Sequence, residues 1–230
     1  MVENRGLMLL CCAGCAVFTA AAVAGVPVIL SDSNSSMSVD LGSPMGQYNW
    51  TVDGVNQLTQ EWFSYAIGAG SPLTLDSIGA AQNVNPQDLN ADGNLDTLYA
   101  KYTASDFTVE VTFGLTGGSV GSGMSDLLTN IRIRNTSNTV LPFHFFDSAN
   151  FDLNGSAPGD SVEVVSNNVV RQTKGLVTVL ETVLTPAASQ VVVGGPPDAT
   201  WTLRWDTDIR PGGTLLISNS VLIFQPYPHA

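Results

Sequence analysis

The fold class follows from the stretch FTVEVTFGL, residues 107–115. Apolar and polar residues alternate along it, so its apolar side chains lie on one face of a β-strand and its polar side chains on the other. Thr97–Tyr102 precedes it across the short turn Ala104–Asp106, which predicts a β-hairpin. The stretch therefore predicts a strand with one buried face and one face in water.

Similar strands are expected on both sides of this hairpin, at a spacing of roughly 10–15 residues with short turns between them. They are predicted at residues 37–41, 48–52, 127–135, 140–146, 161–165, 169–173, 176–184, 190–193, 200–205 and 214–224. Residues 58–67 fit both helical spacing and strand alternation, and their aromatic content favours a strand. Pro142 removes a ladder donor, so an edge strand or a bulge is expected there. We predict an all-β fold, a single antiparallel β-sandwich of Greek-key or jelly-roll type with about ten to thirteen strands.

An export signal is expected at the N-terminus. Residues 1–6 are polar with one positive charge, residues 7–23 are apolar, and Ala22-Val23-Ala24 is a small-x-small cleavage site. All three cysteines (Cys11, Cys12 and Cys15) lie in this segment, so the mature chain would fold without disulfides. Retention of the segment as an anchor and lipid attachment at Cys15 stay open as alternatives. The predicted organisation is a signal peptide at 1–24, a flexible lead-in at 25–36, a β-sandwich domain at 37–225 and a C-terminal tail at 226–230.

Charge excludes some classes of partner. The formal net charge is −12 at pH 7, and the few lysines and arginines are scattered along the chain. Nucleic-acid binding needs a basic face that displaces counterions from phosphates, so no nucleic-acid partner is expected. No apolar run after the leader is long enough to cross a bilayer, so we expect no transmembrane segment in the mature chain. The protein is expected to be exported, either secreted or held in the cell envelope.

The sharpest local motif is DLNADGNLD, residues 88–96. Oxygen-bearing side chains alternate along it and glycine stands at position 6, a spacing that wraps a loop around a hard cation. Tyr99 stands at position 12, where a full EF-hand loop has glutamate, so water or another loop would complete the coordination. The same composition is typical of an ordinary turn, and both interpretations stay open. The hypothesis is a weak calcium site with the ligands Asp88, Asn90, Asp92, Asn94 and Asp96.

No motif marks a catalytic centre. His144 alternates with aromatic residues on a predicted strand, where a structural role is favoured, and no Gly-x-Ser-x-Gly turn is present to hold a nucleophile. Four glutamates alternate with core residues and are expected on solvated strand faces: Glu61, Glu110, Glu163 and Glu181. Four tryptophans could build a sugar-stacking platform, although Trp201 and Trp205 share one strand face, which is typical of a core: Trp50, Trp62, Trp201 and Trp205. We therefore predict that the protein is not an enzyme.

Several stretches together resemble a group of uncharacterised exported bacterial proteins, common in planctomycetes and cyanobacteria, some of which carry a C-terminal Pro-Glu-Pro sorting tail. The stretches are Trp50–Leu58, Glu61–Tyr65, Asp88–Asp96, Ser125–Leu127, Phe143–Phe146 and Phe151–Gly155. The resemblance covers most of the mature chain and implies export and a β-rich fold, but it carries no catalytic residues. The chain ends at Gln225–Ala230 without such a tail, so release or retention by contacts is expected.

These observations favour a non-enzymatic protein that associates with extracellular or cell-envelope material, with calcium stiffening one loop. A carbohydrate-binding module that takes a glycan is the alternative, and it would need at least two solvent-facing tryptophans in a row. A secreted hydrolase is the second alternative. It would need a cleft with two carboxylates at roughly 5–10 Å from each other.

Overall fold

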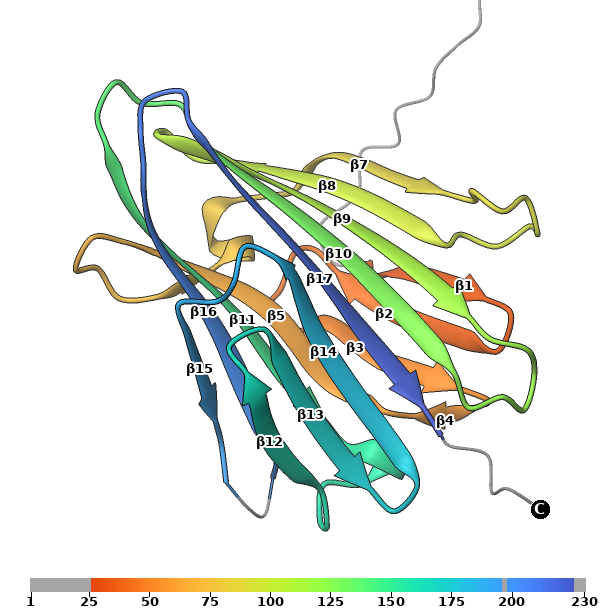
Figure 1. The fold of residues 1–230 in the computed structure, drawn as a ribbon. Coiled ribbons are helices and arrows are strands. Elements are labelled where there is room, and N and C mark those ends of the chain that lie inside the picture. Colours follow the sequence, from red (N-terminus) through yellow and green to blue (C-terminus); the bar gives the residue numbers. More distant parts are fainter. Residues whose placement is uncertain (1–25, 196–197, 226–230) are drawn as a thin grey trace, which may run out of the picture.

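The computed structural model describes residues 26–195 and 198–225. Over these residues the chain forms 17 β-strands and two short 3-10 helices, and the strands lie in two sheets packed face to face (Figure 1). The predicted all-β antiparallel sandwich is confirmed. The strands outnumber the expected ten to thirteen because short strands such as β4 (Val55–Asn56) and β6 (Leu73–Thr74) add to the sheets.

The first sheet has nine strands, in the order β1-β2-β3-β5-β11-β16-β15, with β4 beside β3 and β6 beside β5. Its pairs are antiparallel except for a short parallel contact between β3 and β5. Besides β4 and β6, its strands are β1 (Val28–Asp32), β2 (Ser35–Asp40), β3 (Gly46–Val52), β5 (Leu58–Ile67), β11 (Leu141–Phe151), β15 (Gln190–Val193) and β16 (Thr200–Ile209). The helix η1 (Leu75–Ile78) follows β6.

The second sheet has eight strands, all paired antiparallel, in the order β12-β13-β14-β17-β10-β9-β8-β7. They are β7 (Gln82–Gln87), β8 (Thr97–Thr103), β9 (Phe107–Gly117), β10 (Ser125–Asn135), β12 (Ser161–Ser166), β13 (Val169–Lys174), β14 (Val177–Thr185) and β17 (Thr214–Phe224). The predicted hairpin is the pair β8–β9. The second helix, η2 (Leu153–Gly155), follows β11.

Aromatic side chains join the two sheets in the core. Phe63 of β5 packs against Phe113 of β9 with 6.2 Å between ring centroids, and against Phe145 of β11 at 5.6 Å. Phe63, Phe113 and Phe145 are fully buried. Phe113 belongs to the alternating stretch from which the sandwich was predicted, and the segment 58–67, which fitted both helix and strand, is the strand β5.

The expected flexible lead-in at 25–36 is wrong from residue 28 onward. β1 and β2 pair with each other over Val28–Asp32 and Ser35–Val39, and Leu30 is completely buried. The amide of Ser31 also donates to the carbonyl of Leu95 at 2.7 Å. The alternation along β1 is too short to stand out in the sequence, whereas β2 is the strand predicted at residues 37–41 and begins two residues earlier.

The expectation of an edge strand or bulge at Pro142 is also wrong. Pro142 is the second residue of β11, which lies in the middle of the nine-stranded sheet between β5 and β16. Its carbonyl accepts from the amide of Gly68, just after the end of β5. The N–H and carbonyl of one strand residue point to the same neighbour, so the donor that proline lacks would face a strand that has already ended.

The predicted signal peptide at 1–24, with its cysteines, and the predicted tail at 226–230 lie outside the described residues. Within residues 26–195 and 198–225, no helix has the length and apolar character that a membrane crossing requires.

Candidate functional site

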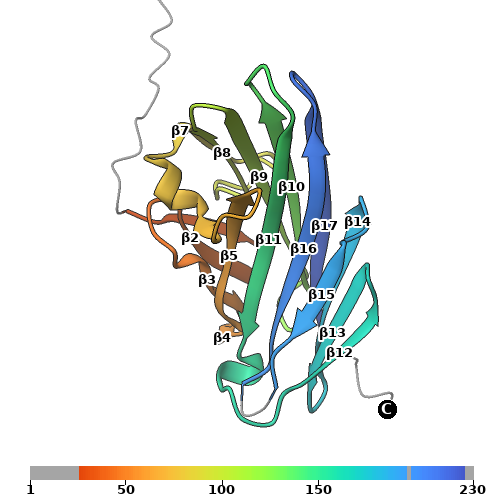
Figure 2. The same ribbon diagram turned by 90° about the vertical axis from the view of Figure 1, so that its left-hand side faces the viewer.

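The exposed face of the nine-stranded sheet carries a regular array of polar side chains. β5, β11 and β16 run side by side there, and the short helix η1 lies beside β5 (Figure 2). Alternate residues of the three strands point outward in four cross-strand rows: Gln60, Asn150 and Thr200; Trp62, Ser148 and Thr202; Ser64, Phe146 and Arg204; and Ala66, His144 and Asp206. Successive rows are about 6.6 Å apart, because each row is two residues further along the strand.

A groove of about 400 Å³ opens over the first three of these rows. Its lining comes from the loop before β3, from β5, β6, β11 and β16, and it contains no charged side chain: Pro44, Gln60, Trp62, Ser64, Thr74, Ser148, Ala149, Asn150, Thr200, Trp201 and Thr202. Trp62 forms part of the lining, and its indole N–H donates to Asp76 of η1 at 3.1 Å. The helix η1 therefore fixes the position of this indole at one side of the groove.

Hydroxyl and amide groups in the groove are arranged in cross-strand pairs. The hydroxyls of Ser148 and Thr202 lie 3.0 Å apart, and Asn150 donates through Nδ2 to Asp198 at 3.0 Å. The Oδ1 atom of Asn150 is buried without a hydrogen-bond partner. Because this oxygen is shielded from solvent, the groups that the groove exposes to a ligand are the hydroxyls of Ser148 and Thr202.

His144, Arg204 and Asp206 form a charged group on the same face, at the end nearest the start of β11. Nδ1 of His144 pairs with Asp206, and Nε of Arg204 donates to the same carboxylate at 2.7 Å. Burial raises the pKa of Asp206, but the hydrogen bonds from His144 and Arg204 and their charges outweigh it and lower the pKa overall. The His144 row is two rows from Ser148, about 13 Å along the strand.

The tryptophans do not form the sugar platform that the sequence allowed. Trp50, Trp62, Trp201 and Trp205 are each at most 4% exposed. The prediction that Trp201, Leu203 and Trp205 share a core face is confirmed. A carbohydrate-binding module with two solvent-facing tryptophans in a row is therefore not what the described residues form.

A second cluster lies inside the sandwich. Glu61 of β5, Asp147 of β11 and Glu181 of β14 have carboxylate oxygens within 4.8 Å of one another, and each side chain is at most 2% exposed. Asn219 of β17 donates through Nδ2 to Asp147 and to Glu181, both at 2.9 Å. The indole N–H of Trp201 donates to the other oxygen of Glu181. The cluster thus joins strands of both sheets.

These three carboxylates have no cationic partner among the ion pairs of the described residues. Burial raises the pKa of Glu61 well above its usual range, and the charge of Glu181 raises it further. Burial and the charges of Glu61 and Glu181 likewise raise the pKa of Asp147 well above its usual range. The pKa of Glu181 is raised by burial, against hydrogen bonds from Trp201, Asn219 and Asp147 that lower it.

The prediction that all four glutamates lie on solvated strand faces is wrong for Glu61 and Glu181. It is right for Glu110 and Glu163, whose side chains are partly exposed and form ion pairs with basic residues on neighbouring strands. Glu61 stands in the same register as Phe63 and Tyr65, and Glu181 in the register of Val179 and Val183. The sequence signal was present: these carboxylates occupy inward positions of their strands.

The loop at residues 88–96 precedes β8. Asp88 accepts hydrogen bonds from the amides of Ala91, Asp92 and Gly93, and Asp96 accepts from those of Leu89 and Asn90. Asn90 and Asp92 each accept from the amide two residues later, the second of which belongs to Asn94. Such bonds occur in ordinary turns, and calcium at Asp88, Asn90, Asp92, Asn94 and Asp96 stays a prediction.

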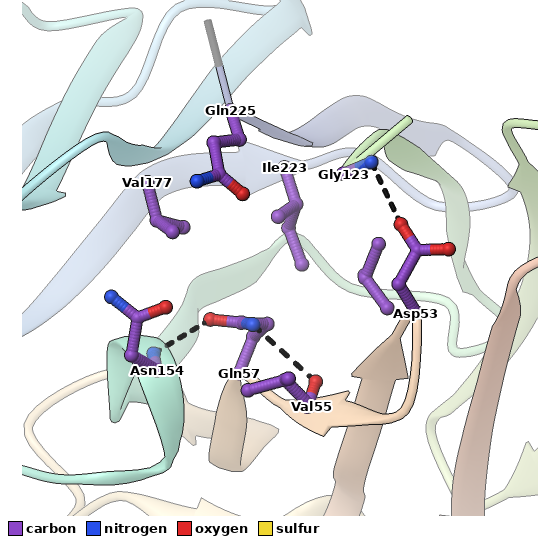
Figure 3. A pocket seen from close by; sticks show the side chains of 9 residues that line it. Asp53, Val55, Gln57, Gly123, Asn154, Val177, Ile223 and Gln225 are labelled. Atoms are coloured by element: carbon purple, nitrogen blue, oxygen red, sulfur yellow. Dashed lines mark hydrogen bonds between the residues drawn. The ribbon is translucent and has the colours of Figure 1, made fainter. Parts of the chain in front are cut away.

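One end of the sandwich holds a small cavity of about 80 Å³, shown in Figure 3. Asp53 accepts from the amides of Gly121 and Gly123, and Gln57 accepts from the amide of Asn154 at 2.9 Å. Burial raises the pKa of Asp53, but these amide hydrogen bonds outweigh it and lower the pKa overall. These side chains connect the loops that close this end, which is a structural role.

Comparison with known proteins identifies the fold. No protein-family model and no curated protein sequence matches the chain. Among solved structures, a protein from Escherichia coli K12 provisionally described as an aldose 1-epimerase is 11% identical, with a TM-score of 0.63 over 87% of this chain and 99% of its own. A protein from Synechocystis sp. PCC 6803 is 11% identical, with a TM-score of 0.67 over 87% and 96% of the two chains. A bacterial glucoamylase solved with acarbose is 9% identical, with a TM-score of 0.61 over 90% of this chain and 33% of its own.

These structures overturn the prediction that the chain is not an enzyme. That prediction rested on a β-sandwich without a familiar catalytic motif, and the same fold is found in a protein described as an epimerase. Absence of a short motif is a weak argument here, because residues that act together on a sheet face come from strands far apart in sequence. His144 and Asp206, for example, are 62 residues apart and paired.

Proposed function

We propose that the protein binds a carbohydrate in the groove on the exposed face of the nine-stranded sheet, which is lined by the first two rows of β5, β11 and β16 and by Ser64 of the third. The observation that carries this proposal is the chemistry of the lining. The groove offers hydroxyl and amide groups in cross-strand rows and contains no charged side chain.

A neutral, polar lining favours a neutral ligand with many hydroxyl groups. A phosphate or carboxylate ligand is usually bound by arginine or lysine, neither of which lines this groove. The volume falls within the range of small-molecule sites. The hydroxyls of Ser148 and Thr202 can both donate and accept, as sugar hydroxyls require.

The fold supports the same proposal. One neighbour is described as an aldose 1-epimerase and another as a glucoamylase in complex with acarbose, and both descriptions concern sugars. Because the tryptophans are buried, affinity is expected to come from hydrogen bonds more than from stacking on aromatic rings. This leads us to expect weak to moderate affinity for single sugars.

Removing the two paired hydroxyls should weaken sugar binding about tenfold. The double variant Ser148→Ala/Thr202→Val keeps side-chain size while deleting two hydrogen-bonding groups, and each such bond contributes about 0.5–1.5 kcal/mol. The measurement is isothermal titration with a panel of neutral mono- and oligosaccharides, starting from the one that the unaltered protein binds best.

The matched control is Thr182→Val/Ser220→Ala. These residues are a directly paired threonine and serine on the eight-stranded sheet, so the same atoms are removed from the opposite side of the molecule. The control should bind as tightly as the unaltered protein. Equal losses in both double variants, or no sugar bound by the unaltered protein, would contradict the proposed site.

Catalysis on a sugar that reaches from the groove to His144, about 13 Å along the strand from Ser148, is a second candidate function, favoured by the His144–Asp206 pair on the same face. Interconversion of two sugar anomers needs one proton removed from the anomeric hydroxyl and one delivered to the ring oxygen. A histidine whose Nδ1 is engaged by a carboxylate can exchange a proton with a ligand through Nε2. The observed pairing therefore suits acid–base work at this end of the face.

This candidate predicts faster mutarotation of free aldoses, followed by polarimetry after dissolving a single anomer. His144→Gln should reduce the rate by about a hundredfold or to the rate in buffer. Asp208→Asn, an exposed carboxylate two residues beyond Asp206 on the same strand, should leave it unchanged. A rate equal to that of buffer for the unaltered protein would exclude this activity and leave binding alone.

A further inference from the structure

The buried carboxylate cluster does not line the groove, and among the described residues it is a group of three side chains that could together hold a metal ion. Glu61 and Asp147 come from the nine-stranded sheet and Glu181 from the eight-stranded sheet, and all three point into the core. Removing three carboxylates from water without compensation is very unfavourable, because each loses its hydration in a low-dielectric interior. A partner of opposite charge would compensate for this loss.

The hydrogen bonds on the cluster leave specific oxygens free. Asn219 and Trp201 satisfy both oxygens of Glu181 and one oxygen of Asp147. Both oxygens of Glu61 and Oδ1 of Asp147 are buried and have no hydrogen-bond partner. The free oxygens thus belong to the two carboxylates contributed by adjacent strands of one sheet.

A separate residue points to the same place. Gln47 of β3 is completely buried, and neither its Oε1 nor its Nε2 has a hydrogen-bond partner. It is paired in register with Glu61 across the short parallel contact between β3 and β5. Its side-chain amide lies close enough to the Glu61 carboxylate to lower the pKa of that group, although the two do not reach hydrogen-bond geometry, and this places Gln47 at the cluster. An unpaired buried amide is rare, and here its oxygen is available beside three carboxylates.

We propose that Glu61, Asp147 and Glu181, with the side-chain oxygen of Gln47, bind one calcium ion between the two sheets. All the available atoms are oxygens, which is the donor set of hard cations. Calcium takes ligands at 2.3–2.6 Å, so two oxygens on one ion are at most about 5 Å apart. The carboxylate oxygens of the cluster, which all lie within 4.8 Å of one another, meet this limit.

Calcium fits this set better than magnesium. Three carboxylates can give one or two oxygens each and Gln47 one more, so up to seven ligands are within reach, and calcium accepts such variable geometry. Magnesium requires a near-ideal octahedron and usually keeps several waters, which a closed core does not favour. The inference does not rest on the proposed sugar site, because the cluster lies on the opposite face of β5 and β11 from the groove.

The protein is first unfolded in denaturant with a chelator, because a buried ion is not expected to exchange freely from the folded chain. It is then refolded in four separate conditions: with chelator, with calcium, with magnesium or with manganese. After removal of free ions, elemental analysis should find one calcium per chain. The melting temperature should be roughly 5–10 °C higher with calcium at a hundred times its dissociation constant than with chelator.

Two double variants separate this site from the loop at 88–96. Glu61→Gln/Asp147→Asn should lose both the bound calcium and the calcium-dependent shift. It should still fold in chelator, because it removes two uncompensated buried charges while keeping side-chain size. Asp88→Asn/Asp92→Asn should keep both the bound calcium and the calcium-dependent shift in melting temperature. If the first variant does not fold, the single variant Glu61→Gln gives the same comparison.

Three results would overturn the inference. One is absence of bound metal together with equal melting temperatures in calcium and chelator, which would mean that protons neutralise the cluster. Another is loss of the bound calcium in Asp88→Asn/Asp92→Asn but not in Glu61→Gln/Asp147→Asn. The third is stronger stabilisation by magnesium than by calcium.

Discussion

Replacing Gly46 by alanine is expected to destabilise the protein by about 2–5 kcal/mol. Gly46 has a φ of +57°, where an L-residue is strained, and a Cβ there would lie 2.3 Å from Cε3 of Trp62 and 2.6 Å from the carbonyl oxygen of Glu61. The carbonyl is backbone and cannot rotate away, so β5 would have to move. Urea unfolding followed by tryptophan fluorescence measures the loss.

Gly54→Ala is the matched control. Gly54 also has a positive φ, at +78°, but no atom lies within 4 Å of the position that a Cβ would take there. The free energy of unfolding of Gly54→Ala should fall only by the cost of the backbone strain, about 1–2 kcal/mol. Equal losses for the two variants would show that the close packing of Gly46 on Trp62 and Glu61 does not contribute.

In chelator, the free energy of unfolding is expected to fall as the pH rises above about 4. The pKa values of Glu61, Asp147 and Glu181 are raised in the folded protein, whereas in the unfolded chain these groups ionise near pH 4. The folded state therefore holds protons that the unfolded state has released, and rising pH favours unfolding. Each unit of pKa difference contributes about 1.4 kcal/mol.

Urea unfolding at a series of pH values tests this dependence. Glu61→Gln/Asp147→Asn should flatten most of the slope, since only Glu181 would remain to titrate. Calcium should reduce the slope in the unaltered protein, because a bound cation replaces the protons. A stability that is constant, or that rises with pH in chelator, would show that the cluster is ionised without cost in the folded chain.

Much of the fold could be predicted from alternation alone. β9, β10 and β17 are long strands with unbroken alternation, and each was expected within a few residues of its observed bounds. β1 was missed because a short strand near a chain end carries few alternating positions, whereas β2 was predicted at residues 37–41, two residues late at its start. The prediction of an edge strand or bulge at Pro142 was wrong because it considered only the hydrogen bond that proline cannot donate. Whether that missing donor matters depends on where the neighbouring strand β5 ends, and β5 ends just before Gly68.

The sites were less accessible to sequence reasoning for a definite reason. The rows of the groove join residues on β5 to residues on β16 that are about 140 positions later, and only the strand order brings them together. The buried cluster had a usable signal in the inward register of Glu61 and Glu181. Reading that register strictly, as for Phe63 and Val179, would have placed both glutamates in the core.

The groove and the cluster are built on the same strands. Along β5, Glu61 points inward and its neighbour Trp62 lines the groove, and along β11 Asp147 and Ser148 have the same relation. Trp201 donates to Glu181 in the core and lies between Thr200 and Thr202, which line the groove. An ion in the cluster would therefore hold the floor of the groove in place from behind.

The sugar site is tested most directly by a crystal structure of the protein with the saccharide that binds best in titration. We predict sugar density in the groove over β11, with hydroxyls hydrogen-bonded to Ser148 and Thr202. Density confined to another surface, such as the outer face of the eight-stranded sheet near Glu110 and Arg132, would contradict the assignment of this groove.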